Sequence, residues 1–233
     1  MRNLAIFDID GTLTDTNAVD DECFLRAIAD VFELDVARVD WSDAPHVTDS
    51  AITQWLSEQH RGRGVDEDEL HRLVRVFVEH LAVELERAPV RFAPIQGAVD
   101  LFPALRAVGW DVALATGGWG PSARLKLRAS RLDEPDLILA CGSDAISREE
   151  IVLLARDRAS SLHGVSYPRV VSVGDGTWDV RTASNLGVPF VGVGSGAREA
   201  RLRAAGASVV LADFQDREAV LRAFATAPVP ARR

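Results

Sequence analysis

The segment spanning residues 4–16 constrains the fold more than any other part of the chain. It opens with four apolar residues (4–7), a run that is too short for a typical helix and predicts a strand buried on both faces, as in a parallel sheet. Asp8 and Asp10 follow with one residue between them, and at a strand end this spacing points both carboxylates to one side of the sheet. Gly11 then allows a sharp turn. Two carboxylates crowded in this position repel each other and predict a bound cation, for which Mg²⁺ is the usual choice beside a phosphate.

The segment between Asn17 and about Phe92 shows no strand pattern. Its apolar residues recur at helical spacing and predict three amphipathic helices. We expect Asn17 to cap the first helix and Thr48 or Asp49 to cap the second, while a run of acidic residues suits the N-terminus of the third. The helices are expected through Phe24–Phe32, Ile52–Leu56 and Asp66–Glu86.

Helical and strand patterns alternate from Gly97 onward. This alternation predicts βαβ units and a parallel sheet, whose functional residues lie beyond the carboxyl ends of the strands. Strands are expected at residues 111–115, 137–140, 169–173, 190–193 and 208–211, with helices at 99–108, 121–131, from Ser147 to 155, at 178–185, and after the later strands.

Composition narrows the classes of function. The 233 residues suffice for one large domain, or for one domain with a small insert. The net charge of −9, without a basic block, argues against a nucleic-acid or anionic-membrane partner. Two distant cysteines predict neither a disulfide framework nor a zinc site. We find no signal-peptide pattern and no apolar run long enough to span a membrane, so we expect a cytoplasmic location.

Two further strand ends carry polar residues. Thr116 can donate its hydroxyl to a phosphoryl oxygen, and Gly117 and Gly118 can expose backbone N–H groups to an anion. Asp175 and Asp179 follow the strand predicted at residues 169–173. Taken alone, each segment is an ordinary strand-to-helix turn, and it is their combination with Asp8 and Asp10 that indicates a site.

These segments resemble the motifs of the haloacid dehalogenase-like (HAD) superfamily. Residues 8–15 (DIDGTLTD) resemble its first motif, residues 116–118 its second and residues 173–179 (VGDGTWD) its fourth. The resemblance implies that Asp8 is a nucleophile that forms an aspartyl-phosphate and that Asp10 is the general acid/base. It also implies that Mg²⁺ is held by Asp8, Asp175 and the backbone carbonyl of Asp10, while Asp179 holds a metal-bound water or orients Asp175.

The third motif departs from the family pattern, because no lysine lies upstream of the fourth motif. Arg148 occupies that place, and a guanidinium can grip phosphate oxygens bidentately. The alternative is that Arg148 is a solvated residue opening a helix. Lys126, the single lysine of the chain, is the second candidate, but its neighbours Arg124 and Arg128 favour a solvent-facing position.

The resemblance also implies a domain layout and an activity. An α/β Rossmann-like core is expected at 1–14 and 94–233, and an inserted helical C1-type cap at 15–93. Near the entrance, His46, Thr48 and Asp49 either select substrate or cap a helix, and Trp119 and Trp178 either line the entrance or are core aromatics.

We expect a Mg²⁺-dependent phosphatase of the phosphoglycolate phosphatase-like type, monomeric or homodimeric, acting on a small phosphorylated metabolite. A phosphomutase similar to β-phosphoglucomutase would use the same residues. A third possibility is a non-catalytic binding or regulatory protein. The presence of all four aspartates, Asp8, Asp10, Asp175 and Asp179, argues against it.

Overall fold

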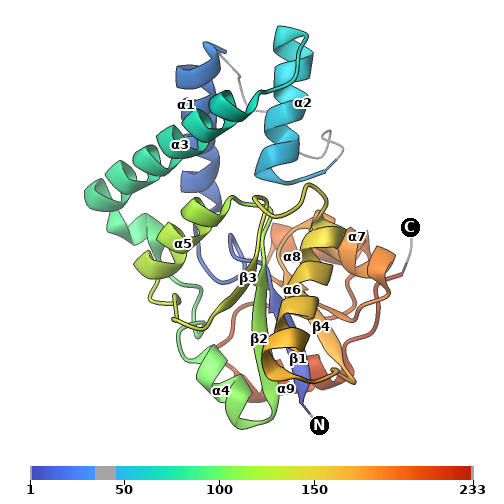
Figure 1. Cartoon of the computed structure of the whole chain (residues 1–233). Helices are drawn as coiled ribbons and strands as arrows, with labels where there is room; N and C mark the ends of the chain where they lie inside the picture. Colours follow the sequence, from blue (N-terminus) through green and yellow to red (C-terminus); the bar gives the residue numbers. More distant parts are fainter. Residues whose placement is uncertain (1, 35–45, 232–233) are drawn as a thin grey trace.

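A six-stranded parallel sheet forms the centre of the computed structural model, which describes residues 2–34 and 46–231 (Figure 1). The strand order is β3-β2-β1-β4-β5-β6, so the N-terminal strand is central. Phe7 at the end of β1 is level with Leu114 of β2 and Val173 of β4, which places the three following polar segments at one edge. The predicted α/β Rossmann-like core is confirmed. The strands are β1 Asn3–Phe7, β2 Trp110–Ala115, β3 Ile138–Ala140, β4 Val170–Gly174, β5 Phe190–Val193 and β6 Val210–Leu211.

Helices cover both faces of the sheet because side chains alternate along each strand. On one face, Phe7 packs its ring 5.8 Å from that of Phe102 and 5.9 Å from that of Phe224. On the other face, Ile6 belongs to a cluster with Ile151. The helices α4, α5 and α7 begin and end close to their predicted bounds, whereas α6 continues well beyond residue 155. The helices of this part are α4 Leu101–Ala107, α5 Gly120–Ala129, α6 Arg148–His163, α7 Thr177–Leu186, α8 Ala197–Ala205 and α9 Arg217–Thr226.

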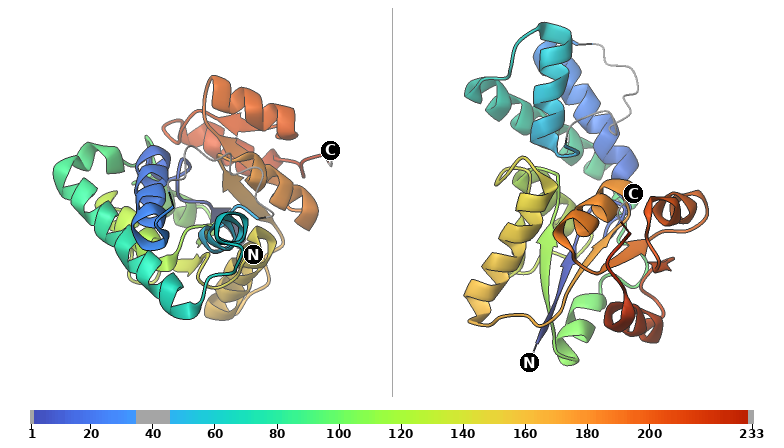
Figure 2. Two further views of the ribbon diagram at one scale, coloured as in Figure 1. Left: turned by 90° about the horizontal axis from the view of Figure 1, so that it is seen from above. Right: turned by 90° about the vertical axis from the view of Figure 1, so that its right-hand side faces the viewer.

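Three helices from the segment after β1 lie beyond the carboxyl edge of the sheet (Figures 1 and 2). They are α1 Asn17–Phe32, α2 Asp49–Arg61 and α3 Glu67–Arg87, followed by the short η2 Pro89–Phe92. Their apolar faces form a separate core cluster, in which Phe24, Phe77 and Trp119 pack their rings 5.7–5.9 Å apart. Since Trp119 precedes α5, this cluster joins the helical layer to the sheet side. The division into a core and a cap domain at 15–93 stays a prediction.

The helix starts test the capping predictions. Thr48 accepts a hydrogen bond from the backbone N–H of Ala51, and Ser147 likewise caps α6. The prediction that Asn17 caps α1 is wrong: Thr16 is the N-cap residue, no side chain caps the helix, and the Asn17 amide instead donates to Asp175 Oδ2 at 3.0 Å.

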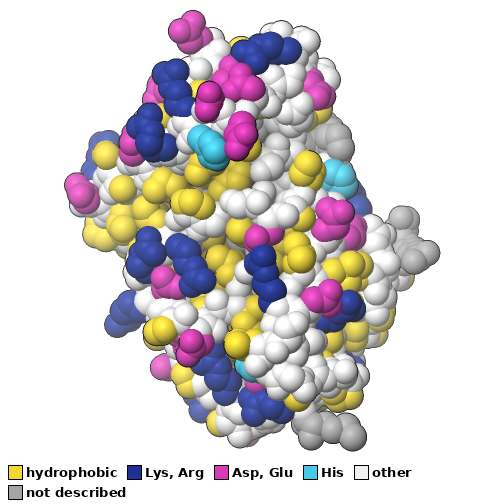
Figure 3. Space-filling view, in the orientation of Figure 1, with side chains coloured by type: hydrophobic (Ala, Val, Ile, Leu, Met, Phe, Trp, Pro, Cys, Tyr) yellow, Lys and Arg dark blue, Asp and Glu magenta, His cyan; other side chains and the backbone are white. Residues whose placement is uncertain are grey.

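Hydrophobic side chains gather over α3 among charged ones (Figure 3), and Val83 there is 57% exposed. Within the described residues, none of the helices combines the length and apolar character that a membrane crossing requires.

Candidate active site

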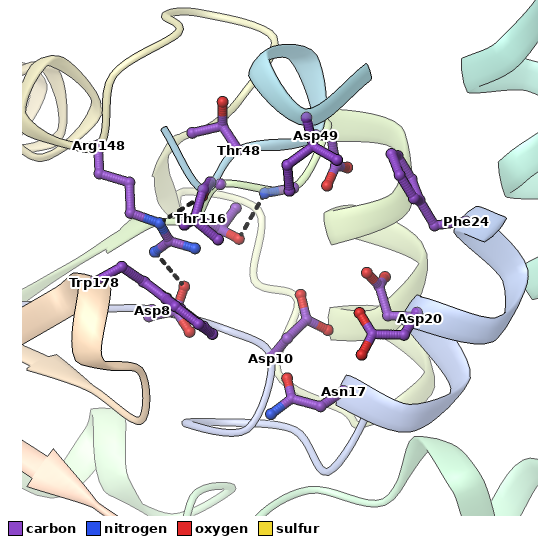
Figure 4. A pocket seen from close by; sticks show the side chains of 15 residues that line it. Asp8, Asp10, Asn17, Asp20, Phe24, Thr48, Asp49, Thr116, Arg148 and Trp178 are labelled. Carbon is purple, nitrogen blue, oxygen red and sulfur yellow. Dashed lines mark hydrogen bonds and ion pairs between the residues drawn. The ribbon is translucent and has the colours of Figure 1, made fainter. Parts of the chain in front are cut away.

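The polar strand ends meet at a cavity of about 160 Å³ between the sheet edge and the helical layer (Figure 4). Segments far apart in the sequence contribute to it, because the level ends of β1, β2 and β4 adjoin the starts of α1, α2 and α6. The described lining residues are Asp8, Asp10, Asn17, Asp20, Asp21, Phe24, Val47, Thr48, Asp49, Ile52, Thr116, Gly117, Gly118, Arg148 and Trp178.

Asp8, Asp175 and Asp179 form a buried acidic trio beside this cavity. Each offers a carboxylate oxygen within 4.8 Å of the others, and each side chain is 5–7% exposed. Asp175 Oδ1 is buried without a hydrogen-bond partner among the described residues. An orphaned buried carboxylate oxygen needs a compensating group, and hard oxygen ligands of this kind fit Mg²⁺.

Burial sets the protonation of the trio. Desolvation, followed by repulsion from Asp179, raises the pKa of Asp8 to about 8. Desolvation and the Asp8 charge raise the pKa of Asp175 to about 7, and desolvation raises that of Asp179 to about 6 against the attraction of Arg148. Without a cation the trio therefore retains protons at neutral pH, and a bound cation would favour their release.

Arg148 lies inside the site, so the solvated alternative is wrong. It is the first residue of α6, its side chain is 14% exposed, and its Nη1 donates to Asp179 Oδ1 at 2.7 Å and to Asp8 Oδ1 at 3.4 Å. Its Nε donates to the Val47 carbonyl at 2.7 Å. The guanidinium also lies 5.5 Å from the centre of the Trp178 ring, a cation–π distance that helps to fix its plane.

The expectation that Lys126 faces solvent is wrong. Its side chain is fully buried, and Nζ lies 2.6 Å from Asp10 Oδ2 and 2.5 Å from Asp20 Oδ1. Successive helix residues are about 100° apart, so a residue two positions away projects to nearly the opposite side. Arg124 and Arg128 are partly exposed for this reason, whereas Lys126 points from α5 toward α1 and the Asp10 loop.

Asp10 reaches the cavity but does not belong to the buried trio. Its Oδ1 accepts a hydrogen bond from Thr16 Oγ1 at 2.5 Å, and its Oδ2 faces Lys126. Figure 4 shows its carboxylate turned toward Asp20 of α1. The Asp10 side chain is thus held apart from the trio, and any metal contact by this residue would come from its backbone.

The segment after β2 lines the cavity as expected. Thr116 is 2% exposed, and its Oγ1 accepts a hydrogen bond from the Gly118 N–H at 3.2 Å. A Cβ at Gly117 would lie 2.7 Å from the Val47 carbonyl and 2.8 Å from Arg148 Nη2. Glycine is therefore required at position 117 for the close approach of the loop to both groups.

The helical layer meets the sheet side through polar contacts as well. Thr48 Oγ1 donates to the Ile146 carbonyl at 2.8 Å, and an oxygen of Asp49 accepts from the Trp119 N–H at 2.9 Å. Trp119 itself is buried as a core aromatic, whereas Trp178 lines the cavity. His46 is exposed and is not a lining residue.

The sequence analysis did not predict Asp20 or Phe24 as lining residues. Phe24 was expected as part of the apolar face of α1, which is true of most of its side chain. Asp20 is an acidic residue in the first turn of α1, a position where acidic residues are common, so the sequence gave little indication that it lines a cavity.

Comparisons with known proteins agree with the fold. A family model described as haloacid dehalogenase-like hydrolase matches residues 3–187. The chain is 23% identical over 215 residues to a phosphoglycolate phosphatase of Mesorhizobium japonicum, covering 91% of this chain and 92% of the relative. It is 29% identical over 227 residues to the probable phosphatase IndB of Dickeya dadantii, covering 93% and 92%. The crystal structure of a hydrolase from Pseudomonas syringae superposes with a TM-score of 0.72 at 21% identity, covering 95% and 98%, which is a likeness of fold.

Proposed function

The chain belongs to the haloacid dehalogenase-like hydrolase family, and its named relatives support a phosphatase; on this premise we propose a Mg²⁺-dependent enzyme that hydrolyses a small phosphorylated metabolite through an aspartyl-phosphate. The observation that carries the proposal is the buried trio of Asp8, Asp175 and Asp179 beside the Arg148 guanidinium. A cavity of about 160 Å³ suits a small substrate.

The metal would be held by Asp8, Asp175 and the backbone carbonyl of Asp10, with Asp179 supporting them. Bound there, Mg²⁺ would neutralise charge on the phosphoryl oxygens. Asp175 Oδ1, which has no hydrogen-bond partner among the described residues, supports this assignment. Arg148 would bind phosphoryl oxygens, because its guanidinium already points at the nucleophile. Thr116, Gly117 and Gly118 would complete the anion site with a hydroxyl and backbone N–H groups.

The reaction would take two steps at the same phosphorus atom. A carboxylate oxygen of Asp8 attacks phosphorus, the ester P–O bond breaks, and Asp10 gives its proton to the leaving alkoxide. Water then attacks the aspartyl-phosphate, Asp10 takes a proton from that water, and inorganic phosphate leaves as the Asp8 carboxylate is restored. Asp10 lines the cavity without joining the trio, which suits a group that handles protons.

The test is phosphate release from a panel of phosphate monoesters, with Mg²⁺ and with chelator. We expect Mg²⁺-dependent release that Asp8→Asn abolishes, together with a covalent phosphate on acid-quenched wild-type enzyme. Asp157→Asn, which removes an exposed carboxylate on α6, is the matched control and should retain full activity. Isomerised sugar phosphate without net release would establish the mutase instead, and Mg²⁺ binding without either product would refute an enzymatic role. The monomeric or dimeric state and the cytoplasmic location stay predictions.

A further inference from the structure

Lys126 is fully buried between two carboxylates that come from different parts of the fold. Asp10 belongs to the loop after β1 and Asp20 to the first turns of α1, while Lys126 lies on α5. The two carboxyl groups face each other in Figure 4, an arrangement that a cation between them stabilises whenever either group is ionised. The Lys126 ammonium, within 2.6 Å of both, is that cation.

The residue type is informative. The chain has 26 basic residues, of which 25 are arginine, so its one lysine stands where the two carboxylates converge. An ammonium is a compact charge with three donors that can point at separate acceptors, whereas a guanidinium is a wide planar fork. A site enclosed between α1, α5 and the Asp10 loop favours the smaller group.

Both oxygens of Asp10 are directed by neighbours. Lys126 holds Oδ2, and the Thr16 hydroxyl holds Oδ1. Each carboxylate oxygen keeps a second lone pair, so this fixation leaves room for a transferred proton. Without Lys126, Asp10 Oδ2 loses its hydrogen-bond donor and only the Thr16 hydroxyl still holds the group, so the Asp10 side chain would turn away from its present position.

We propose that Lys126 is a positioning residue for the reaction, which orients Asp10 for proton transfer to the leaving group and ties it to α1 through Asp20. The inference rests on the proposed function, in which Asp10 is the general acid. It assigns to α1 a second purpose besides enclosing the cavity, because its Asp20 completes the clamp that sets the orientation of Asp10.

The test compares two leaving groups. An alkyl phosphate needs its leaving oxygen protonated, whereas p-nitrophenyl phosphate releases a stable phenolate without help. General acid catalysis contributes about 10²–10⁴-fold, so Lys126→Met should lower kcat/KM for the alkyl ester about 100-fold and for the aryl ester less than about fivefold. Equal losses of kcat/KM for the two esters would show that Lys126 has a merely structural role and would overturn the proposal.

Two control variants lie on the same helix. Arg128→Met removes an exposed cation two residues away and should leave kcat/KM for both esters unchanged. Leu127→Ala makes a cavity in the buried core and should reduce stability without changing the ratio of the two kcat/KM values. A Leu127→Ala variant that reproduced the selective loss would refute the assignment of that loss to the Lys126 charge.

A double variant covers the case in which Lys126→Met fails to fold. Lys126→Met with Asp20→Asn leaves the cluster with the same net charge, because it removes one cation and one carboxylate together. We expect this variant to fold and to keep the selective loss on the alkyl ester. Full recovery of alkyl-ester hydrolysis would mean that Lys126 only neutralises Asp20, and the proposal would be wrong.

A crystal structure of the double variant gives a readout that does not depend on turnover. The Asp10 carboxylate should leave its present orientation once Nζ is removed, and an unmoved Asp10 would overturn the proposal even for an inactive protein. Failure of the proposed function is distinguishable, because it appears as an inactive wild type whose Asp10 orientation still depends on Lys126.

Discussion

Replacing Asp8 by asparagine should make the metal-free protein more stable at alkaline pH while abolishing its activity. Burial raises the pKa of Asp8 from 3.8 to about 8, so the native state holds a proton there that the unfolded chain releases. Such a group contributes stability that is fully present below the unfolded pKa and is lost as pH rises through the folded pKa. An asparagine side chain cannot ionise, so the Asp8→Asn variant escapes this loss.

The magnitude follows from the size of the shift. Each pKa unit corresponds to about 1.4 kcal/mol, so between pH 5 and pH 8 the wild type should lose up to about 4 kcal/mol of unfolding free energy relative to Asp8→Asn. Above pH 8 the difference should level off. Mg²⁺ at about 100 times its dissociation constant would return about 2.7 kcal/mol to the wild type.

Urea unfolding in chelator at pH 5, 6, 7 and 8 measures this difference directly. Asp157→Asn is again the matched control, because it removes one negative charge from an exposed position and should give a gap that does not vary with pH. A gap between wild type and Asp8→Asn that stays constant across the range would show that Asp8 ionises normally. The reasoning about the buried trio would then be wrong.

Three further outcomes are expected. Gly11→Ala should weaken Mg²⁺ binding measured by calorimetry and destabilise the protein, since Gly11 has φ +76° and a Cβ there would lie 2.1 Å from Asp175 Oδ2. The control Gly62→Ala, at φ +68° with no atom of the described residues within 4 Å, should cost only the backbone strain of about 1 kcal/mol and leave Mg²⁺ affinity intact. Arg148→Met should lower kcat/KM at least about 100-fold, whereas Arg156→Met, a partly exposed cation on the same helix, should have no effect; equal activities would refute the phosphate-binding role. Monoesters with a carboxylate or second phosphate should show kcat/KM at least tenfold below neutral hydroxylated esters of similar size, because the described lining residues carry five carboxylates and one guanidinium; a preference for the doubly anionic esters would contradict this.

The sequence was sufficient for features that depend on local pattern. Alternation of apolar runs and helical spacing predicted the parallel sheet, and the strand predicted at residues 190–193 matches β5 without change. The strand ends predicted Asp8, Thr116 and Asp175 at one edge, because parallel strands in register end together. Local chemistry also predicted the cap at Ser147 and, as one of two candidates beside Asp49, the cap at Thr48.

Contacts between side chains far apart in the sequence could not be predicted from local sequence patterns. Asn17 is a residue type that often caps helices, but its side-chain amide donates a hydrogen bond to Asp175, 158 positions further along the chain. The residues next to Asn17 give no sign of this competing contact. Lys126 lies between two arginines on a short helix, and only the packing of α5 against α1 shows which face is enclosed. Helical spacing predicts that one face of a helix is buried. It does not predict that carboxylates from other elements pack against that face.

The site divides its acidic residues into two arrangements with different needs. The trio sets three carboxylates against the guanidinium of Arg148, a deficit that a divalent cation would cancel and that protons fill in its absence. Asp10 and Asp20 have a cation of their own in Lys126. Because Lys126 is covalently part of the chain, the second arrangement stays paired whether or not a metal is bound. In the proposed reaction, the nucleophile Asp8 would therefore depend on a metal for its charge balance, whereas the side chain of Asp10 keeps the same cationic partner with or without one.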